Sequence, residues 1–241
     1  MKKKNRLQEF ARYVSLNVMG MIGLSCYILA DTFFVSKGLG TDGLTALNLA
    51  IPIYNFIHGS GLMIGMGGGT RYSIQKSQED HKAANRTFTH TLYLAAVFAV
   101  IFVAVGLLFA GDIVYLFGAR DNVYTMSRTY LRVILLFAPA FLLNNLLSCF
   151  VRNDGAPQLS MAAMIGGSLS NVVLDWVFIF PCGMGIFGAV FATGLAPIIS
   201  MLILSSHFIR RHNGFYPVKC RPQPGQAGWI LSSGVPSLVT E

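Results

Sequence analysis

Long segments dominated by apolar residues recur along the whole chain, separated by short groups of charged residues. A helix of about 20 apolar residues is long enough to cross the hydrocarbon core of a bilayer, and it satisfies its own backbone hydrogen bonds there. The sequence therefore predicts an all-α integral membrane protein. Six spans are expected, over residues 13–36, 44–69, 88–110, 130–150, 159–180 and 186–209.

The composition excludes several other classes of protein. Of the 241 residues, 54% are hydrophobic and 12% are charged, and the mean hydropathy is +0.57. An average soluble domain carries about 25% charged residues, so a cytosolic enzyme is not expected. The formal net charge of +8 comes from 18 Lys and Arg residues in small groups between apolar segments. Because they form no basic face with interleaved aromatic residues, the expected partner is the lipid bilayer and not a nucleic acid.

The Lys and Arg residues are distributed unevenly between the two sides of the predicted topology. Most of them precede the first span, lie between the second and third spans, or follow the fourth and sixth. Segments rich in Lys and Arg remain in the cytoplasm, so the N-terminus is expected there. In this topology Cys182 and Cys220 lie on opposite sides of the membrane and cannot form a disulfide.

The end of the sequence differs from the six predicted spans. Residues 210–228 form a basic segment with Pro and Gly residues, which is expected to be a cytoplasmic linker. Residues 229–241 are typical of the start of a seventh transmembrane helix, but they are too few to cross a bilayer. We therefore expect residues 1–209 to form one six-helix lobe of a larger membrane protein.

Two acidic residues, Asp31 and Asp175, lie inside predicted spans, whereas the other eight fall in loops or tails. A carboxylate in the hydrocarbon region costs several kcal/mol unless it faces a polar cavity or becomes protonated. Residues kept there are therefore candidates for ion or proton binding. The alternative interpretation is a structural hydrogen bond within the helix bundle.

Polar neighbours favour a functional role for Asp175. Asn171 precedes it by four residues and therefore shares its helical face, with Ser168 one turn further back. Other spans contribute Tyr130, Asn144, Asn145 and Thr193. Carboxylate, amide and hydroxyl groups that converge in a bundle are suited to binding Na+ or relaying a proton. Taken singly, Asn145 and Thr193 are better explained as hydrogen bonds between helices.

The glycine run at residues 65–69 ends the second predicted span and fails the GxGxxG pattern, because Thr follows it. It predicts close helix packing or a flexible gate near the cytoplasmic face, involving Gly67 and Gly68. His58 and Pro139 are weaker candidates for a substrate cavity or gate. A histidine in a span more often makes a bundle hydrogen bond, and a proline within a span permits a kink.

Five segments together carry a resemblance to a known family. They are DTFFVSKGLGTDGLTALNLAIPI from residue 31, LIGMGGGTRYS, FVRNDGAPQLSMAAMIGGSLSNVVLDWVFIF, GIFGAVFATGLAPIIS, and GVPS in the predicted seventh span. In this order and spacing they resemble the N-terminal half of the multidrug and toxic compound extrusion (MATE) transporters. Each segment is loosely defined alone, but the set covers essentially the whole chain.

The resemblance implies a transporter of the bacterial cytoplasmic membrane, with twelve spans in two pseudo-symmetric six-helix lobes and a substrate cavity between them. The implied activity is export of amphipathic or cationic drugs and xenobiotics in exchange for H+ or Na+, with no cofactor besides that coupling ion. The second, C-terminal lobe would be missing from this chain. Transport requires one lobe to move against the other.

The resemblance also implies roles for particular residues. Asp31 resembles the acidic residue of the family's first span, and Asn171 and Asp175 resemble its N-x-x-x-D pair, where any bound Na+ is expected. Other members of the polar network in the family's N-terminal lobe have their likeness here in three residues, because this chain resembles the family at Thr193, Asn145 and Tyr130. The chain departs from the family pattern at Leu16, where many members have proline, and at Ser36, where they have glycine.

Other functions remain open from the sequence. A flippase for lipid-linked saccharides has a related two-lobed fold, but its cavity is strongly cationic, whereas these spans contain almost no Lys or Arg. A truncated, non-transporting remnant is the second alternative. An intramembrane aspartyl protease is not expected, because the segments LADTF and NVVLDWV lack a G-x-G-D motif. No enzymatic activity is predicted.

Overall fold

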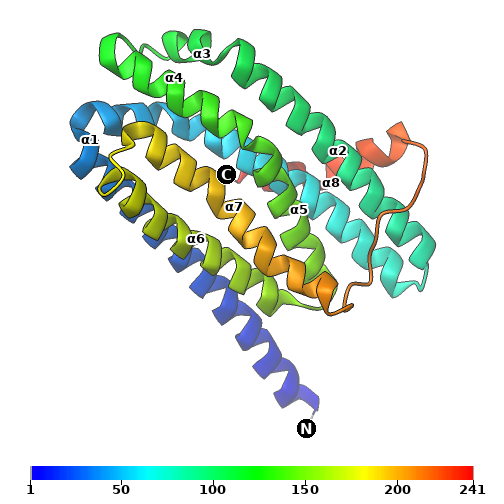
Figure 1. The fold of residues 1–241 in the computed structure, drawn as a ribbon. Helices are drawn as coiled ribbons and strands as arrows, with labels where there is room; N and C mark the ends of the chain where they lie inside the picture. The colour runs from blue at the N-terminus through cyan, green and yellow to red at the C-terminus, as the bar shows by residue number, and fades with distance from the viewer. Residues whose placement is uncertain (1, 241) are drawn as a thin grey trace.

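The computed structural model describes the backbone of residues 2–240 and the side chains of residues 18 and 29–240, so that the departure at Leu16 lies outside the described side chains. In this part of the chain all regular secondary structure is helical, and no strand is present (Figure 1). Its helices are α1 (Lys2–Ser77), α2 (His81–Leu108), α3 (Ala110–Leu116), α4 (Asp121–Leu136), α5 (Ala138–Asn153), α6 (Pro157–Ile179), α7 (Gly185–Ile209) and α8 (Pro224–Val239).

Within the described residues, four helices are long and apolar enough to cross a membrane. They are α2, α6, α7 and the part of α1 over Leu29–Ser77. A fifth span results if α4 and α5, which meet at an angle of 46°, are counted as one bent span. The prediction of an all-α membrane protein is therefore confirmed, whereas the predicted number of six spans is not established by these helices.

The first two predicted spans lie in α1 and are separated by a break at Gly40. Its dihedral angles are φ 69° and ψ −158°, a conformation that glycine adopts without Cβ strain. The chain reverses its direction there (Figure 1). We call residues 2–39 the first arm of α1 and residues 41–77 its second arm. The reversal puts Asp31 and His58 on different arms that pack into one bundle.

A second break separates α4 from α5 and lies at Phe137, which is the C-cap of α4 and the N-cap of α5. Pro139 occupies the first turn of α5, where its missing N–H sacrifices no helical hydrogen bond. The bend of the fourth predicted span is therefore a helix junction, and Pro139 is exposed on the surface.

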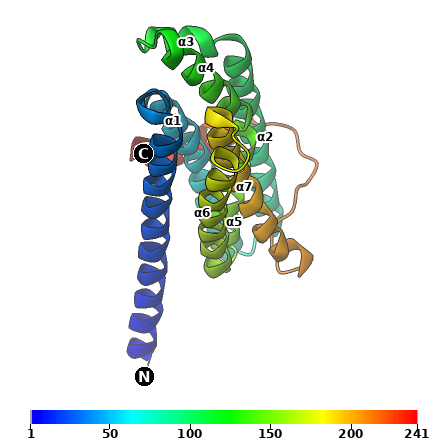
Figure 2. The same cartoon turned by 60° about the vertical axis from the view of Figure 1, so that its left-hand side comes forward.

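The linker after the sixth predicted span is shorter than expected, because α8 begins at Pro224 and not at residue 229. Residues 210–223, which we call the strap, run beside α2 before the chain enters α8 (Figure 1). The helix α8 packs against the second arm of α1. On the other side of the bundle, α5, α6 and α7 lie side by side (Figure 2).

Candidate functional site

Two buried carboxyl groups meet between the first arm of α1 and α6. The carboxyl groups of Asp31 and Asp175 are close enough to interact directly with each other. Asp31 is 7% exposed and Asp175 is fully buried. The sequence singled out both residues separately, and the structure brings them together as one acidic pair.

Asn171 and Thr193 hold the Asp175 side of this pair. With its amide oriented to satisfy both partners, Asn171 donates to Asp175 Oδ2 over 2.9 Å and accepts from the Thr193 N–H over 3.1 Å. The hydroxyl of Thr193 donates to the carbonyl of Ala189 over 3.1 Å. The spacing of four residues between Asn171 and Asp175 thus produces the shared helical face that the sequence predicts.

Tyr130 joins the same cluster from α4. Its ring is buried, and its hydroxyl lies within hydrogen-bonding reach of the Thr193 side chain. The same hydroxyl is close enough to Asp31 and Asp175 to interact electrostatically with both carboxyl groups. Five of the six predicted ion-site residues therefore converge, from four different helical segments. We call Asp31, Tyr130, Asn171, Asp175 and Thr193 the acidic cluster.

Among the side chains that the structure describes, no basic group neutralises the acidic cluster. Neither carboxylate takes part in a salt bridge among the described residues. The Oδ1 atoms of Asp31 and Asp175 are both buried without a hydrogen-bond partner. Two adjacent ionised carboxylates repel each other strongly in a low-dielectric environment. The pair is therefore suited to holding a proton, or to taking up a small cation with oxygen ligands.

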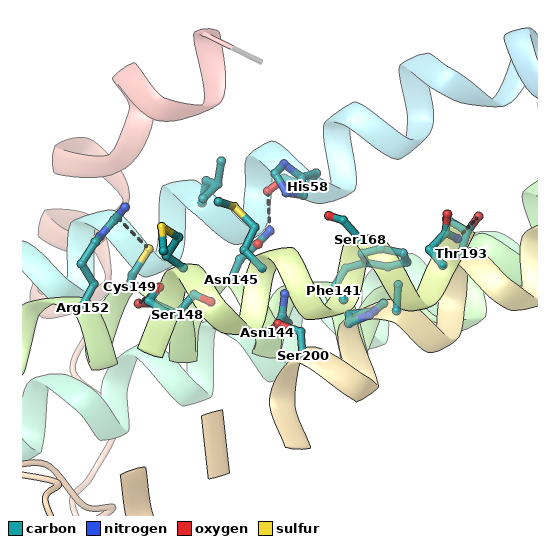
Figure 3. Close-up of a pocket in the computed structure, with 18 of the residues that line it drawn as sticks. His58, Phe141, Asn144, Asn145, Ser148, Cys149, Arg152, Ser168, Thr193 and Ser200 are labelled. Atoms are coloured by element: carbon teal, nitrogen blue, oxygen red, sulfur yellow. Dashed lines mark hydrogen bonds between the residues drawn. The ribbon is translucent and has the colours of Figure 1, made fainter. Parts of the chain in front are cut away.

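A cavity of about 290 Å³ extends from Asn171 and Thr193 between the second arm of α1, α5, α6 and α7. Figure 3 shows Thr193 and Arg152 at opposite ends of it. His58 and Asn145 line the cavity, and the amide of Asn145 donates to the carbonyl of His58 over 3.1 Å. Asn145, the sixth predicted ion-site residue, is therefore a cavity residue that links two helices.

Two further side chains aim polar atoms at this cavity without a partner in the structure. They are Ser200, which is 3% exposed, and Asn144. Unpaired buried oxygens in a roomy cavity are suited to water or to a ligand's polar groups. The sequence reasoning missed Ser200. A signal for it existed, because Ser200 lies seven residues after Thr193 and therefore on the same face of α7.

Gly67, Gly68 and Pro139 do not line the cavity. A side chain at Gly67 would meet the backbone of Ile230 in α8, and one at Gly68 would meet Thr91 in α2. Of the two roles predicted for the glycine run, the structure shows close helix packing at these positions.

Comparison with known proteins identifies relatives of the chain. The MatE family model matches residues 18–177. The multidrug export protein MepA of Staphylococcus saprophyticus is 27% identical over 185 residues, which are 77% of this chain and 41% of that protein. MepA of Staphylococcus aureus is 26% identical over 215 residues, or 88% of this chain and 48% of its own length. The chain thus spans about half the length of these curated relatives.

Solved structures give the same picture of the fold. A MATE protein crystallised with MaD3S superposes with a TM-score of 0.86 at 28% identity, over 95% of this chain and 52% of that one. An outward-facing multidrug resistance MATE family transporter gives 0.81 at 29% identity over the same shares. A MOP superfamily transporter from Pyrococcus furiosus gives 0.84 at 27% identity. The chain belongs to the MatE family, whose members are membrane transporters and not enzymes.

Proposed function

We propose that this chain is the N-terminal lobe of a cation-coupled exporter of amphipathic and cationic organic compounds. The observation that carries the proposal is the acidic cluster, in which two buried carboxyl groups meet and neither forms a salt bridge with a described basic residue. Buried ionisable residues in membrane spans are typical of ion and proton pathways. The multidrug export proteins named MepA that match the chain support drug export as the transported step.

The cluster supplies a chemical route to coupling. When the pair holds a proton or Na+, its net negative charge is smaller, and the first arm of α1 can remain packed against α6. Release of the cation leaves two facing carboxylates whose repulsion favours separation of these segments. Binding and release of one cation therefore biases the lobe between two arrangements, which is what exchange against a substrate requires. The choice between H+ and Na+ is left to experiment.

Residues 1–209 are proposed to form the lobe, the strap to lead to a second lobe, and α8, which begins at Pro224, to start the first helix of that lobe. The substrate cavity of such a transporter lies between two lobes that move against each other. Among the described residues that line the cavity within this lobe, Arg152 is the one Lys or Arg side chain. That is a poor match to the strongly cationic cavity of a lipid-linked saccharide flippase.

Transport driven by separately imposed gradients tests the proposed function. The protein is produced from its complete gene, and ethidium movement is followed in everted membrane vesicles that lack the protein or contain it. We expect ethidium accumulation to rise when either an H+ gradient or a Na+ gradient is imposed, and to collapse when that gradient is dissipated. Equal ethidium movement in vesicles with and without the protein, under both gradients, would reject drug export.

The orientation in the membrane is tested with native cysteines. Cys182 is exposed in the turn between α6 and α7, and Cys220 lies in the strap, at the opposite end of α7. With a cytoplasmic N-terminus, a membrane-impermeant maleimide added to intact cells should label Cys182 and leave Cys220 unmodified. Mass spectrometry assigns each label, and buried Cys149 serves as the unreactive control. Labelling of Cys220 but not Cys182 would invert the topology.

A further inference from the structure

A buried carboxylate outside the acidic cluster binds groups from several helices at one end of the bundle. Asp154 follows α5, and its side chain is fully buried. From α1 it accepts hydrogen bonds from the Tyr72 hydroxyl and the Lys76 ammonium group. From α7 it accepts one from His207 Nε2 over 2.9 Å. The fourth donor is the backbone N–H of Gly214 in the strap, over 2.7 Å.

These four donors keep Asp154 charged. Burial alone would disfavour its ionised form, but the donors outweigh burial and hold the pKa of the Asp154 carboxyl below its usual range. Asp154 is therefore a carboxylate at neutral pH and forms an ion pair with Lys76. Charge-assisted hydrogen bonds of this kind are stronger than neutral ones. The contact of Asp154 with the strap is accordingly a firm attachment point.

The residue after Gly214 is inserted into the bundle. Phe215 is fully buried, although it belongs to a segment without regular secondary structure. Aromatic rings surround it with centroid distances of 4.7 to 5.7 Å, from Phe88, Phe208, Phe150 and Tyr72. Burying a Phe side chain removes a large apolar area from water and so stabilises the docked position of the residue that carries it. The buried Phe215 side chain thus anchors the strap next to the Asp154 carboxylate.

Polar side chains along one face of α2 bind the rest of the strap. They satisfy backbone groups that an unattached loop would leave to water. The pairs are Asn85 with the N–H of Tyr216 (3.0 Å), Thr89 with the N–H of Val218 (2.9 Å), His90 with the carbonyl of Arg221 (3.2 Å) and Tyr93 with the carbonyl of Cys220 (3.3 Å). The strap therefore lies in a fixed path from α7 to the start of α8.

We propose that Asp154 is the positioning residue that fastens the strap to the lobe, and that the fastened strap holds the start of α8 against α1. A linker between two lobes would ordinarily be treated as a flexible tether. Here its path is fixed by one carboxylate, one buried ring and a row of hydrogen bonds.

Cysteine reactivity tests this proposal without requiring transport. The protein, in native membranes, is treated with membrane-permeant N-ethylmaleimide, and the labelling rate of each cysteine is measured by mass spectrometry. Cys220 is partly buried in the strap, and Cys182 is exposed in a distant turn. Asp154→Ala should release the strap and raise the Cys220 rate by about tenfold through local opening, while the Cys182 rate stays constant.

Two further variants keep the test decisive. Asp80→Asn is the matched control, because Asp80 lies in the α1–α2 turn at the same end of the bundle and its exposed side chain accepts a local hydrogen bond from the N–H of Ala83. Gly214→Val disturbs the same contact from the strap side, since a Cβ at Gly214 would approach Asp154 Oδ1 to 2.7 Å. Labelling of buried Cys149 would show that Asp154→Ala has unfolded the protein. In that case the Cys220 rate of Gly214→Val tests the proposal. An unchanged Cys220 rate in whichever variant remains folded overturns the proposal. Failure of drug export would leave this result intact.

Discussion

Gly67→Ala is expected to displace α8 from α1 and to destabilise the protein by about 2–3 kcal/mol, because overpacking at a fixed backbone contact forces helices apart. Gly67 and Gly234 lie at the crossing of these two helices. A Cβ at Gly67 would overlap the carbonyl of Ile230, and one at Gly234 would overlap the carbonyl of Met63. Backbone atoms cannot rotate away as a flexible side chain can, so one helix must shift.

Tryptophan fluorescence gives a local measurement of this displacement. Trp229 of α8 lies over the guanidinium group of Arg71 in α1, 4.8 Å from the guanidinium carbon to the ring centroid. The sequence has two tryptophans, so Trp176→Phe leaves Trp229 as the single reporter. In that background, Gly67→Ala should change the Trp229 emission and lower the thermal midpoint in detergent.

The matched control is Gly225→Ala in the first turn of α8, where a new Cβ would meet nothing within 4 Å. It should leave both the emission and the midpoint at their starting values. An unaltered emission in Gly67→Ala would show that α8 is not seated on α1 through these glycines, and the close packing assigned to the glycine run would be withdrawn.

The membrane-helix character was predictable from the sequence because it depends on local properties. Apolar length decides whether a helix spans a bilayer, and α2, α6 and α7 follow the predicted segments closely. Breaks within helices were less predictable. Pro139 suggested a kink within a span, whereas the junction lies two residues earlier at Phe137, because proline is well accommodated in a first helical turn.

The contents of the candidate site were partly predictable, for a related reason. Helical periodicity placed Asn171 and Asp175 on one face, but it relates only residues of the same helix. The meeting of Asp31 with Asp175 depends on how α1 reverses at Gly40 and packs against α6, which no local pattern encodes. The sequence likewise places Asp154 among the acids in loops. Its partners come from three distant parts of the chain, so no local pattern predicts that it is buried.

Asp31→Asn and Asp175→Asn should each lower gradient-driven ethidium transport at least about tenfold, and the double variant should be no worse than either single one. Residues that act as a unit show this non-additivity. The two carboxyl groups are close neighbours, so either substitution removes the paired acids that the coupling cation is proposed to occupy. Substituting the second acid as well should therefore cause no further decrease in the transport rate.

Initial transport rates in the everted vesicles described above measure this cycle, normalised to the amount of protein in the membrane. Asp112→Asn is the matched control, because Asp112 lies exposed in the first turn of α3, and it should retain the full rate. Losses that multiply in the double variant would show that Asp31 and Asp175 act independently. Undiminished coupled transport in Asp175→Asn would remove Asp175 from the coupling mechanism. A double variant that is no worse than either single variant is the result expected for one cation held between two carboxyl groups. In such a pair, binding at one acid changes the charge that acts on the other.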